Sequence, residues 1–143
     1  VISGHKAAVE RAVEVAKARG VKRAMILPVS APFHCSLMGP AADAMAEALD
    51  RVAMAAPNPP LVANVTAAKA TDPAIIKDLL VKQVTGTVRW RECVAAMVAM
   101  GCTRFVEAGA GKVLTGLMKR NAPEAQAQAV GTPADIEAFL GSL

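Results

Sequence analysis

The residues best suited to chemistry lie in a proline-rich loop that contains one of the chain's two histidines. His34 follows Pro32 and Phe33 and stands between an apolar segment and an amphipathic one. Because Pro28 and Pro32 restrict φ and disfavour helix just before them, the backbone around His34 is predicted to be extended and rigid. A histidine held in such a loop can exchange protons near neutral pH. Composition alone favours a simpler role, in which His34 only makes a loop hydrogen bond.

A glycine turn gives a second candidate site. Backbone N–H groups at a helix start attract anions, so Gly109-Ala110-Gly111-Lys112 invites a phosphate-binding role. The Rossmann fingerprint needs a third glycine where Leu114 stands, and the Walker motif needs Ser or Thr where Val113 stands. Both motifs fail, and a close-packed turn from strand to helix is favoured. Glu107, just before the turn, is left with two roles: a functional carboxylate or a cap on the following helix.

The remaining nucleophiles give weaker signals. No Gly-x-Ser-x-Gly elbow surrounds any of the four serines, which are Ser3, Ser30, Ser36 and Ser142. Cys35 adjoins His34, but neighbours on an extended segment point in opposite directions, so no Cys–His pair is expected. Cys35, Cys93 and Cys102 are odd in number and lack metal-ligand spacing, which indicates reduced thiols in a cytoplasmic protein. His5 is most simply a solvated surface residue.

Composition excludes several classes of function. The chain has 143 residues, the size of one domain, with 54% hydrophobic and 3% aromatic residues. Its net charge of +4 comes from charges of alternating sign along the helices, which is typical of a solvated surface. Without interleaved aromatics, nucleic-acid binding is not expected. No membrane span or signal peptide is recognised, and the opening at Val1-Ile2 suggests a piece of a longer protein.

The order of apolar segments predicts an α/β fold with a mostly parallel sheet. Strands are predicted at 1–2, 21–27, 61–65, 105–107 and 126–130. Helices are predicted at 5–19, from Met38 to Val52, after Pro73, from Trp90 to Val98, up to Arg120 and after Pro133.

The helix after Pro73 carries two informative details. Thr71 or Asp72 is expected to cap it, with Pro73 at its first position. Its apolar stripe of Ile76, Leu79 and Leu80 continues into the polar residue Gln83. A buried amide must find hydrogen-bond partners or it costs about 1–3 kcal/mol, so Gln83 is expected to have a partner.

Four segments, read together, are the basis of a family resemblance. They are Ile2–Ala12, Pro32–Met38, Gln83 and Glu107–Leu117. Their residues, order and spacing resemble the C-terminal half of the malonyl-CoA:acyl carrier protein transacylases, and the resemblance covers the whole chain. Acyltransferase domains of polyketide or fatty acid synthases are a close variant, although the Pro32–Met38 run looks more like the discrete bacterial enzymes.

The resemblance implies an α/β-hydrolase-like large subdomain with a ferredoxin-like small subdomain inserted in it. Residues 1–30 would be the end of the ferredoxin-like small subdomain. Residues 31–143 would be the C-terminal part of the α/β-hydrolase-like large subdomain. The active site of the family lies in the cleft between the two, so His34 would stand at that cleft.

The resemblance also implies a function in fatty acid biosynthesis. These enzymes move a malonyl group from coenzyme A to the phosphopantetheine thiol of acyl carrier protein by a ping-pong mechanism with a serine nucleophile. His34 would be the general base, and Gln83 matches the position whose backbone carbonyl orients it. No metal and no cofactor is expected beyond malonyl-CoA as substrate.

In the family, the nucleophilic serine, the malonyl-binding arginine and an oxyanion-hole glutamine belong to an N-terminal half that these 143 residues do not include. The chain alone is therefore predicted to be inactive, to expose apolar sheet surface, and to aggregate or to pair with that half.

An alternative function is non-catalytic. An α/β module could bind acyl carrier protein, which tends to be acidic, through a basic rim. The candidate residues are Arg89, Arg91, Lys112, Lys119 and Arg120. The same charges could also do no more than solvate helices.

Overall fold

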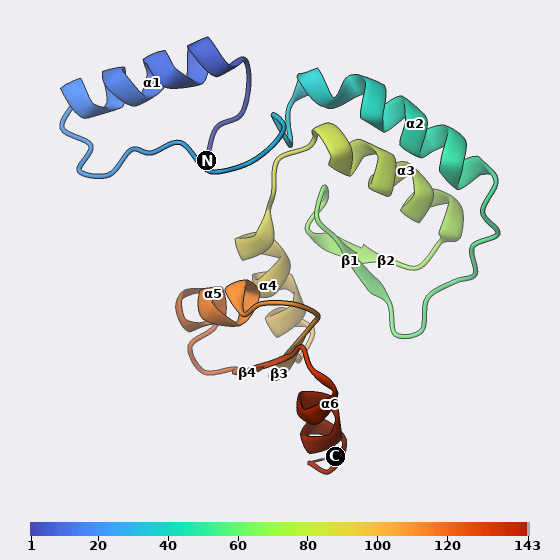
Figure 1. The fold of residues 1–143 in the computed structure, drawn as a ribbon. Coiled ribbons are helices and arrows are strands. Elements are labelled where there is room, and N and C mark those ends of the chain that lie inside the picture. The colour runs from blue at the N-terminus through green and yellow to red at the C-terminus, as the bar shows by residue number, and fades with distance from the viewer. Residues whose placement is uncertain (143) are drawn as a thin grey trace. The chain divides into compact units, whose positions relative to one another are not determined.

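The computed structural model describes residues 1–142. They form two compact units, Val1–Arg89 and Trp90–Leu143 (Figure 1). Each unit has a two-stranded sheet of its own, antiparallel in the first and parallel in the second.

The first unit contains a helical pair packed near a β-hairpin. Its elements are α1 (Lys6–Ala18), the 3₁₀ helix η1 (Ser36–Met38), α2 (Gly39–Asp50), β1 (Leu61–Ala63), β2 (Ala68–Ala70) and α3 (Pro73–Thr85). Figure 1 shows α2 and α3 side by side, with the hairpin beside α3. The helix predicted at 5–19 is confirmed. Its apolar stripe is half-buried while the rest of the helix is exposed, and the stripe consists of Val9, Ala12, Val13 and Ala16.

The core of this unit lies between α3 and the hairpin. Ile76 and Leu79 of α3 are 5% and 9% exposed and pack with Ala63 and Ala70 of the two strands. Leu80, which the stripe also included, is exposed. The apolar contact therefore fixes one face of α3 on the hairpin, and the polar end of the same helix at Gln83 extends beyond it.

The start of α3 shows which of two residues caps it. Asp72 Oδ1 accepts hydrogen bonds from the backbone N–H groups of Ala74, at 2.8 Å, and Ile75, at 3.0 Å. Pro73 occupies the first helical turn, where a missing N–H costs nothing. Asp72 rather than Thr71 is therefore the cap.

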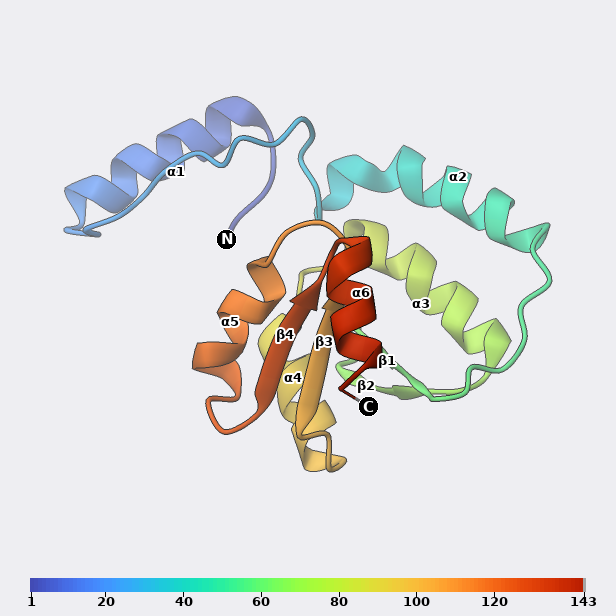
Figure 2. The ribbon, with the colours of Figure 1, turned by 60° about the horizontal axis from the view of Figure 1, so that its bottom comes forward.

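The second unit is a small α/β layer structure. Its elements are α4 (Trp90–Ala99), β3 (Arg104–Ala108), α5 (Val113–Asn121), β4 (Gln126–Val130) and α6 (Pro133–Leu140). Strands β3 and β4 are parallel and pair from Arg104↔Gln126 to Ala108↔Val130, with α5 as their connection. In Figure 2 α6 lies in front of these strands and α4 behind them. Thr132 and Asp135 form a capping box at the start of α6.

Two expectations about strands are wrong. Residues 1–2 and 21–27 are not strands, because neither segment pairs with another strand among residues 1–142. The hairpin strand Ala68–Ala70 was not anticipated, and its pairing with β1 is antiparallel, although a mostly parallel sheet was expected. The sequence Ala-Lys-Ala carries no β-branched or aromatic residue and gives no strand signal. The observed fold is mixed α/β.

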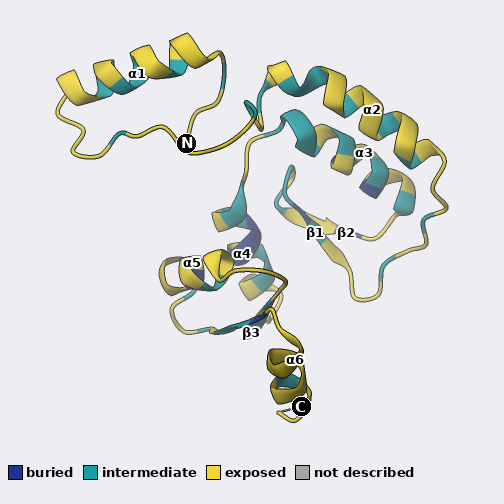
Figure 3. Cartoon of the chain, in the orientation of Figure 1, coloured by how far each residue is buried: buried dark blue, intermediate teal, exposed yellow. Residues whose placement is uncertain are grey.

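Many large apolar side chains are exposed in this structure. Figure 3 shows exposed residues along most of α1 and α6. Met25 and Ile26, in the extended segment after α1, are 57% and 52% exposed, and Val113 is 71% exposed. Only Val94 among the described side chains is completely buried.

We expect Asp72→Ala to lower the free energy of unfolding by about 1 kcal/mol, because two backbone donors of α3 lose their acceptor. Chemical denaturation followed by circular dichroism measures this change. Thr71→Ala, at the neighbouring exposed position, is the matched control and should leave the midpoint unchanged. An equal loss in both variants would contradict the assignment of Asp72 as the cap.

Candidate active site

The loop that carries His34 turns sharply at the histidine itself. His34 has φ +62°, in the left-handed region, and the Phe33 N–H donates to the Ala31 carbonyl at 2.9 Å. The prediction of an extended backbone around His34 is therefore wrong at this residue. A non-glycine residue in this region costs on the order of 1–3 kcal/mol, so surrounding contacts must hold it there.

Contacts on both sides hold the loop. Cys35 Sγ donates to the Pro32 carbonyl oxygen at 3.1 Å, which closes the loop around the histidine. The helical turn η1 then begins directly after Cys35. The Cys35 thiol is thus engaged with the backbone, as expected for a thiol that forms no pair with His34. Among residues 1–142, Cys35, Cys93 and Cys102 form no disulfide.

The C-terminal end of α3 supplies the partners of the His34 ring. His34 Nδ1 lies 3.1 Å from the carbonyl oxygen of Gly86 and 3.3 Å from the side-chain nitrogen Nε2 of Gln83. His34 is exposed, and Gln83 is half-buried. The structure thus brings Gln83 next to the histidine through its side-chain amide. The backbone carbonyl at the ring is that of Gly86, whereas the resemblance implied the carbonyl at the Gln83 position.

Gly86 is suited to this place by its lack of a side chain. It follows the last residue of α3, and its N–H donates to the carbonyls of Lys82 and Gln83. A Cβ atom at Gly86 would lie 2.9 Å from the Lys82 carbonyl oxygen, which is too close. Since glycine permits this close approach, its own carbonyl is free to face His34.

The two ring contacts imply different tautomers. A carbonyl oxygen accepts only, so the Gly86 contact requires a proton on Nδ1. That tautomer leaves a lone pair on Nε2, which is what a general base needs. The Gln83 nitrogen is a donor and is compatible only with an unprotonated Nδ1. The carbonyl contact is the shorter of the two and favours the tautomer with a basic Nε2.

Glu107 caps the helix that follows it, which is one of the two roles that the sequence left open. Its carboxylate accepts from Leu114 N at 3.0 Å, from Thr115 N at 2.7 Å and from Thr115 Oγ1 at 2.7 Å, so it caps the start of α5. The hydrogen bonds from the backbone and hydroxyl of Thr115, with a smaller effect of Leu114, hold the pKa of Glu107 below its ordinary value.

The glycine turn before α5 serves close packing of the backbone. Gly109 and Gly111 have φ values of +126° and +93°, which glycine adopts readily. The Gly109 N–H donates to the Val130 carbonyl at 3.0 Å, and a Cβ at Gly131 would lie 2.7 Å from the Gly109 carbonyl oxygen. These contacts agree with the interpretation of the segment as a strand-to-helix turn.

The basic residues of the alternative function are divided between the two units. Arg89 is half-buried, and its guanidinium donates to the Val65 carbonyl at 3.0 Å, so it has a structural contact. The other four are exposed and belong to the second unit; they are Arg91, Lys112, Lys119 and Arg120.

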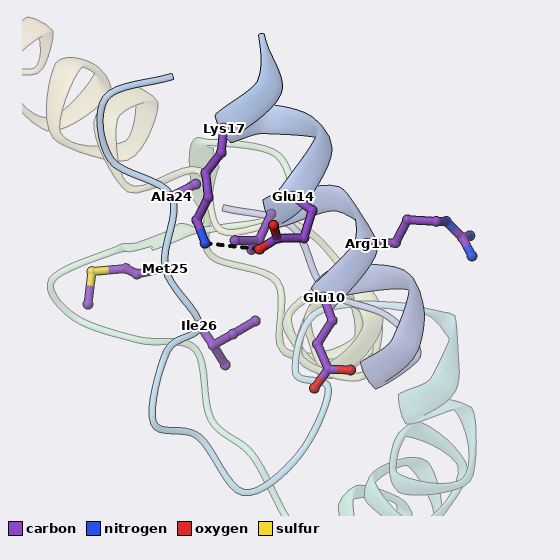
Figure 4. Close-up of a pocket in the computed structure, with 8 residues that line it drawn as sticks. Glu10, Arg11, Glu14, Lys17, Ala24, Met25 and Ile26 are labelled. Carbon is purple, nitrogen blue, oxygen red and sulfur yellow. Dashed lines mark hydrogen bonds and ion pairs between the residues drawn. The ribbon is translucent and has the colours of Figure 1, made fainter. Parts of the chain in front are cut away.

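A further hollow lies between α1 and the extended segment at 24–26 (Figure 4). Glu14 and Lys17 form an ion pair of 2.9 Å there, drawn as a dashed line, and Met25 and Ile26 line the other side. Its charged groups are exposed side chains of α1, and the His34 loop takes no part in it.

Over residues 1–142, no group of His, Cys, Asp and Glu side chains is arranged to hold a metal ion. Within the same residues, no helix is both long and apolar enough to cross a membrane.

Two curated proteins with similar sequences share one name. The malonyl CoA-acyl carrier protein transacylase of Salmonella typhimurium is 48% identical over 140 residues, which is 98% of this chain and 45% of that protein. The Bacillus subtilis protein of the same name is 42% identical over 143 residues, or 100% of this chain and 45% of its own length. This chain is a homologue of the malonyl CoA-acyl carrier protein transacylases. It spans about 45% of the length of these curated relatives. No protein-family model matches the chain.

Solved transacylase structures agree with this homology. The Bartonella henselae acyl-carrier-protein S-malonyltransferase superposes with a TM-score of 0.89 at 52% identity, covering 97% of this chain and 44% of that one. A malonyl-transacylase solved in complex with a type II polyketide synthase acyl-carrier protein superposes with a TM-score of 0.89 at 41% identity. The match covers 98% of this chain and 45% of that one.

The capping role of Glu107 predicts a pH-dependent stability. Because the folded pKa lies below the ordinary value of 4.5, the cap contributes fully above that pH and is lost as the pH falls through the folded pKa. Glu107→Gln should therefore lower Tm near neutral pH, and the difference from the unmodified chain should shrink on acidification.

The control for this measurement is Glu124→Gln, which changes an exposed glutamate of the same unit. It should leave Tm unchanged at both pH values. A Glu107→Gln difference that stays constant down to strongly acidic pH would contradict the capping role.

Proposed function

We propose that this chain forms the histidine-bearing part of a malonyl-CoA:acyl carrier protein transacylase, with His34 as general base. The observation that most directly supports this role is the Gly86 carbonyl oxygen 3.1 Å from His34 Nδ1, within a chain homologous to these transacylases. A proton held on Nδ1 leaves Nε2 able to accept one from a nucleophile. Gln83, whose side chain lies beside the ring, is proposed to help orient it by packing, because its amide nitrogen cannot hydrogen-bond to a protonated Nδ1.

In the first half-reaction, a serine hydroxyl outside these 143 residues attacks the thioester carbonyl of malonyl-CoA. His34 Nε2 takes the hydroxyl proton as the bond from serine oxygen to carbon forms. The carbon–sulfur bond then breaks, and the imidazolium returns the proton to the departing thiolate of coenzyme A. A malonyl-serine ester remains.

In the second half-reaction, the phosphopantetheine thiol of acyl carrier protein attacks that ester. His34 accepts the thiol proton and gives it to the serine oxygen as the ester bond breaks, which regenerates the enzyme. A neutral carbonyl such as that of Gly86 stabilises the imidazolium less than a carboxylate does. Thiols ionise more easily than alcohols or amines, so thioester chemistry asks less of this stabilisation.

The same homology supports a proposed architecture. Residues 1–30 are proposed to end a ferredoxin-like small subdomain, and residues 31–143 to form the C-terminal part of an α/β-hydrolase-like large subdomain. The exposed apolar residues Met25, Ile26 and Val29 support a further segment of the same protein packing beside them, because apolar surface of this kind is usually covered.

We expect the isolated chain to form no covalent adduct with malonyl-CoA, because the serine that accepts the malonyl group is proposed to lie outside it. Intact-mass spectrometry of the 14.7 kDa chain before and after malonyl-CoA tests this. A stable malonyl adduct on the isolated chain would show that the acceptor is within these residues.

A chimera tests the role of His34. In it, this chain replaces the matching 140 residues of the Salmonella typhimurium relative. We expect malonyl transfer to acyl carrier protein, and a loss of about 10²- to 10⁴-fold in kcat/KM for His34→Ala, the usual contribution of a general base. His5→Ala, at the exposed N-terminus of α1, is the matched control and should leave transfer unchanged.

Two outcomes would contradict the proposal. One is a chimera in which His34→Ala transfers malonyl groups as fast as the unmodified chain. The other is a chimera that binds acyl carrier protein but never transfers a malonyl group, which would favour the non-catalytic module. In that case charge reversal at Arg91 and Lys119 should weaken the binding.

A further inference from the structure

Asn64 lies in the turn between β1 and β2 and contacts three separate groups near the His34 site. Its Nδ2 donates to the Thr87 carbonyl oxygen at 2.8 Å and to Oε1 of Gln83. Its Oδ1 accepts from the backbone N–H of Arg89 at 2.6 Å. The side chain is half-buried, and both amide hydrogens and the oxygen are used.

The two backbone contacts fix which way the Asn64 amide faces. The Thr87 carbonyl can only accept, and the Arg89 N–H can only donate, so Nδ2 must face Thr87 and Oδ1 must face Arg89. A flipped amide would put two acceptors together at one contact and two donors at the other.

The orientation of Asn64 then determines that of Gln83. Because Nδ2 of Asn64 is a donor, the Gln83 atom next to it must be the oxygen Oε1. The other end of the Gln83 amide, Nε2, therefore points at Nδ1 of His34. The chain of contacts runs from the hairpin turn to the histidine ring.

The same side chain also anchors the segment that presents the Gly86 carbonyl. Thr87 follows Gly86 directly and Arg89 comes two residues later, and the backbone of each is hydrogen-bonded to the Asn64 side chain. Arg89 is tied to the hairpin a second time through the Val65 carbonyl. These bonds hold the end of α3 to the turn, with Gly86 between the helix and the anchor.

We propose that Asn64 is a positioning residue for His34. It holds the Gly86 carbonyl at Nδ1 through the backbone of Thr87 and Arg89. It also turns the donor Nε2 of Gln83 towards Nδ1, which disfavours a proton there and leaves the shorter Gly86 contact to hold it. The proton on Nδ1, and hence the basic Nε2, then depends on one carbonyl. The catalytic consequence of this positioning rests on the proposed function. The effect of Asn64 on the ring tautomer can be measured without it.

The tautomer of His34 is measured directly by long-range ¹H–¹⁵N correlation spectra of the 143-residue chain, in which His5 is the only other histidine. The unmodified chain should show the proton on Nδ1. Asn64→Ala releases Gly86 and should shift the ring towards a mixture of both tautomers. Thr66→Ala, in the same turn, is the matched control and should leave the ring signals unchanged.

A second variant separates positioning from folding. In Asn64→Asp, the carboxylate still accepts from the Arg89 N–H but has no donor to offer. The Gln83 amide should therefore reverse, so that Nε2 donates to the carboxylate and Oε1 faces Nδ1. Since the Thr87 carbonyl lies at an exposed position, water can replace its lost donor. Asn64→Asp should therefore retain the proton on Nδ1 that Asn64→Ala loses.

In the chimera, Asn64→Ala should lower kcat by about 10- to 100-fold, the range known for partners that orient a metal-bound histidine. Asn64→Asp should recover most of this loss, and Tm is recorded for every variant. Unchanged ring signals in Asn64→Ala would overturn the proposal, as would loss of the Nδ1 proton in Asn64→Asp. A chimera inactive with the unmodified chain would count against the proposed function alone, because the tautomer is read in this chain without any turnover.

Discussion

The contact between His34 Nδ1 and the Gly86 carbonyl joins two segments 52 residues apart, and much of the first unit serves to hold it. The left-handed turn at His34 brings the ring to the end of α3. The apolar face of α3 fixes that helix on the hairpin, and the helix end at Gly86 then sets where the carbonyl lies. A shift of one helical residue, about 1.5 Å, would break the hydrogen bond.

Polar residues at helix starts stabilise several other elements, and three of them have the same capping role. Asp72, Glu107 and Asp135 are all carboxylates that accept backbone N–H groups at the start of a helix. The hydrogen bonds of each are the ones that any helix start needs. Glu107 stands beside a glycine turn, where functional carboxylates often lie, yet its two oxygens accept hydrogen bonds from the first turn of α5.

Local patterns in the sequence predicted the helices, because the helical period and the capping residues can be recognised from a few neighbouring residues. The strands β3 and β4 were found for the same reason, as short apolar runs between helices. The hairpin strand at 68–70 was missed, since Ala-Lys-Ala pairs through its backbone and has no side-chain signal. The segment at 21–27 has the composition of a strand but no strand to pair with among residues 1–142, and pairing is not a local property. Gln83 was singled out as a polar residue on an apolar stripe, whereas Gly86 and Asn64 act through a carbonyl and a turn that no motif marks.

The left-handed backbone of His34 has a consequence for how this loop tolerates replacement. Alanine would have to bear the same unfavourable φ without the ring contacts that hold it, whereas glycine adopts it at little cost. His34→Gly therefore preserves the course of the loop better than His34→Ala and leaves an opening the size of an imidazole beside the Gly86 carbonyl. Because the position is exposed, imidazole from solution can reach that opening, and the left-handed backbone that glycine tolerates is what keeps the opening in place.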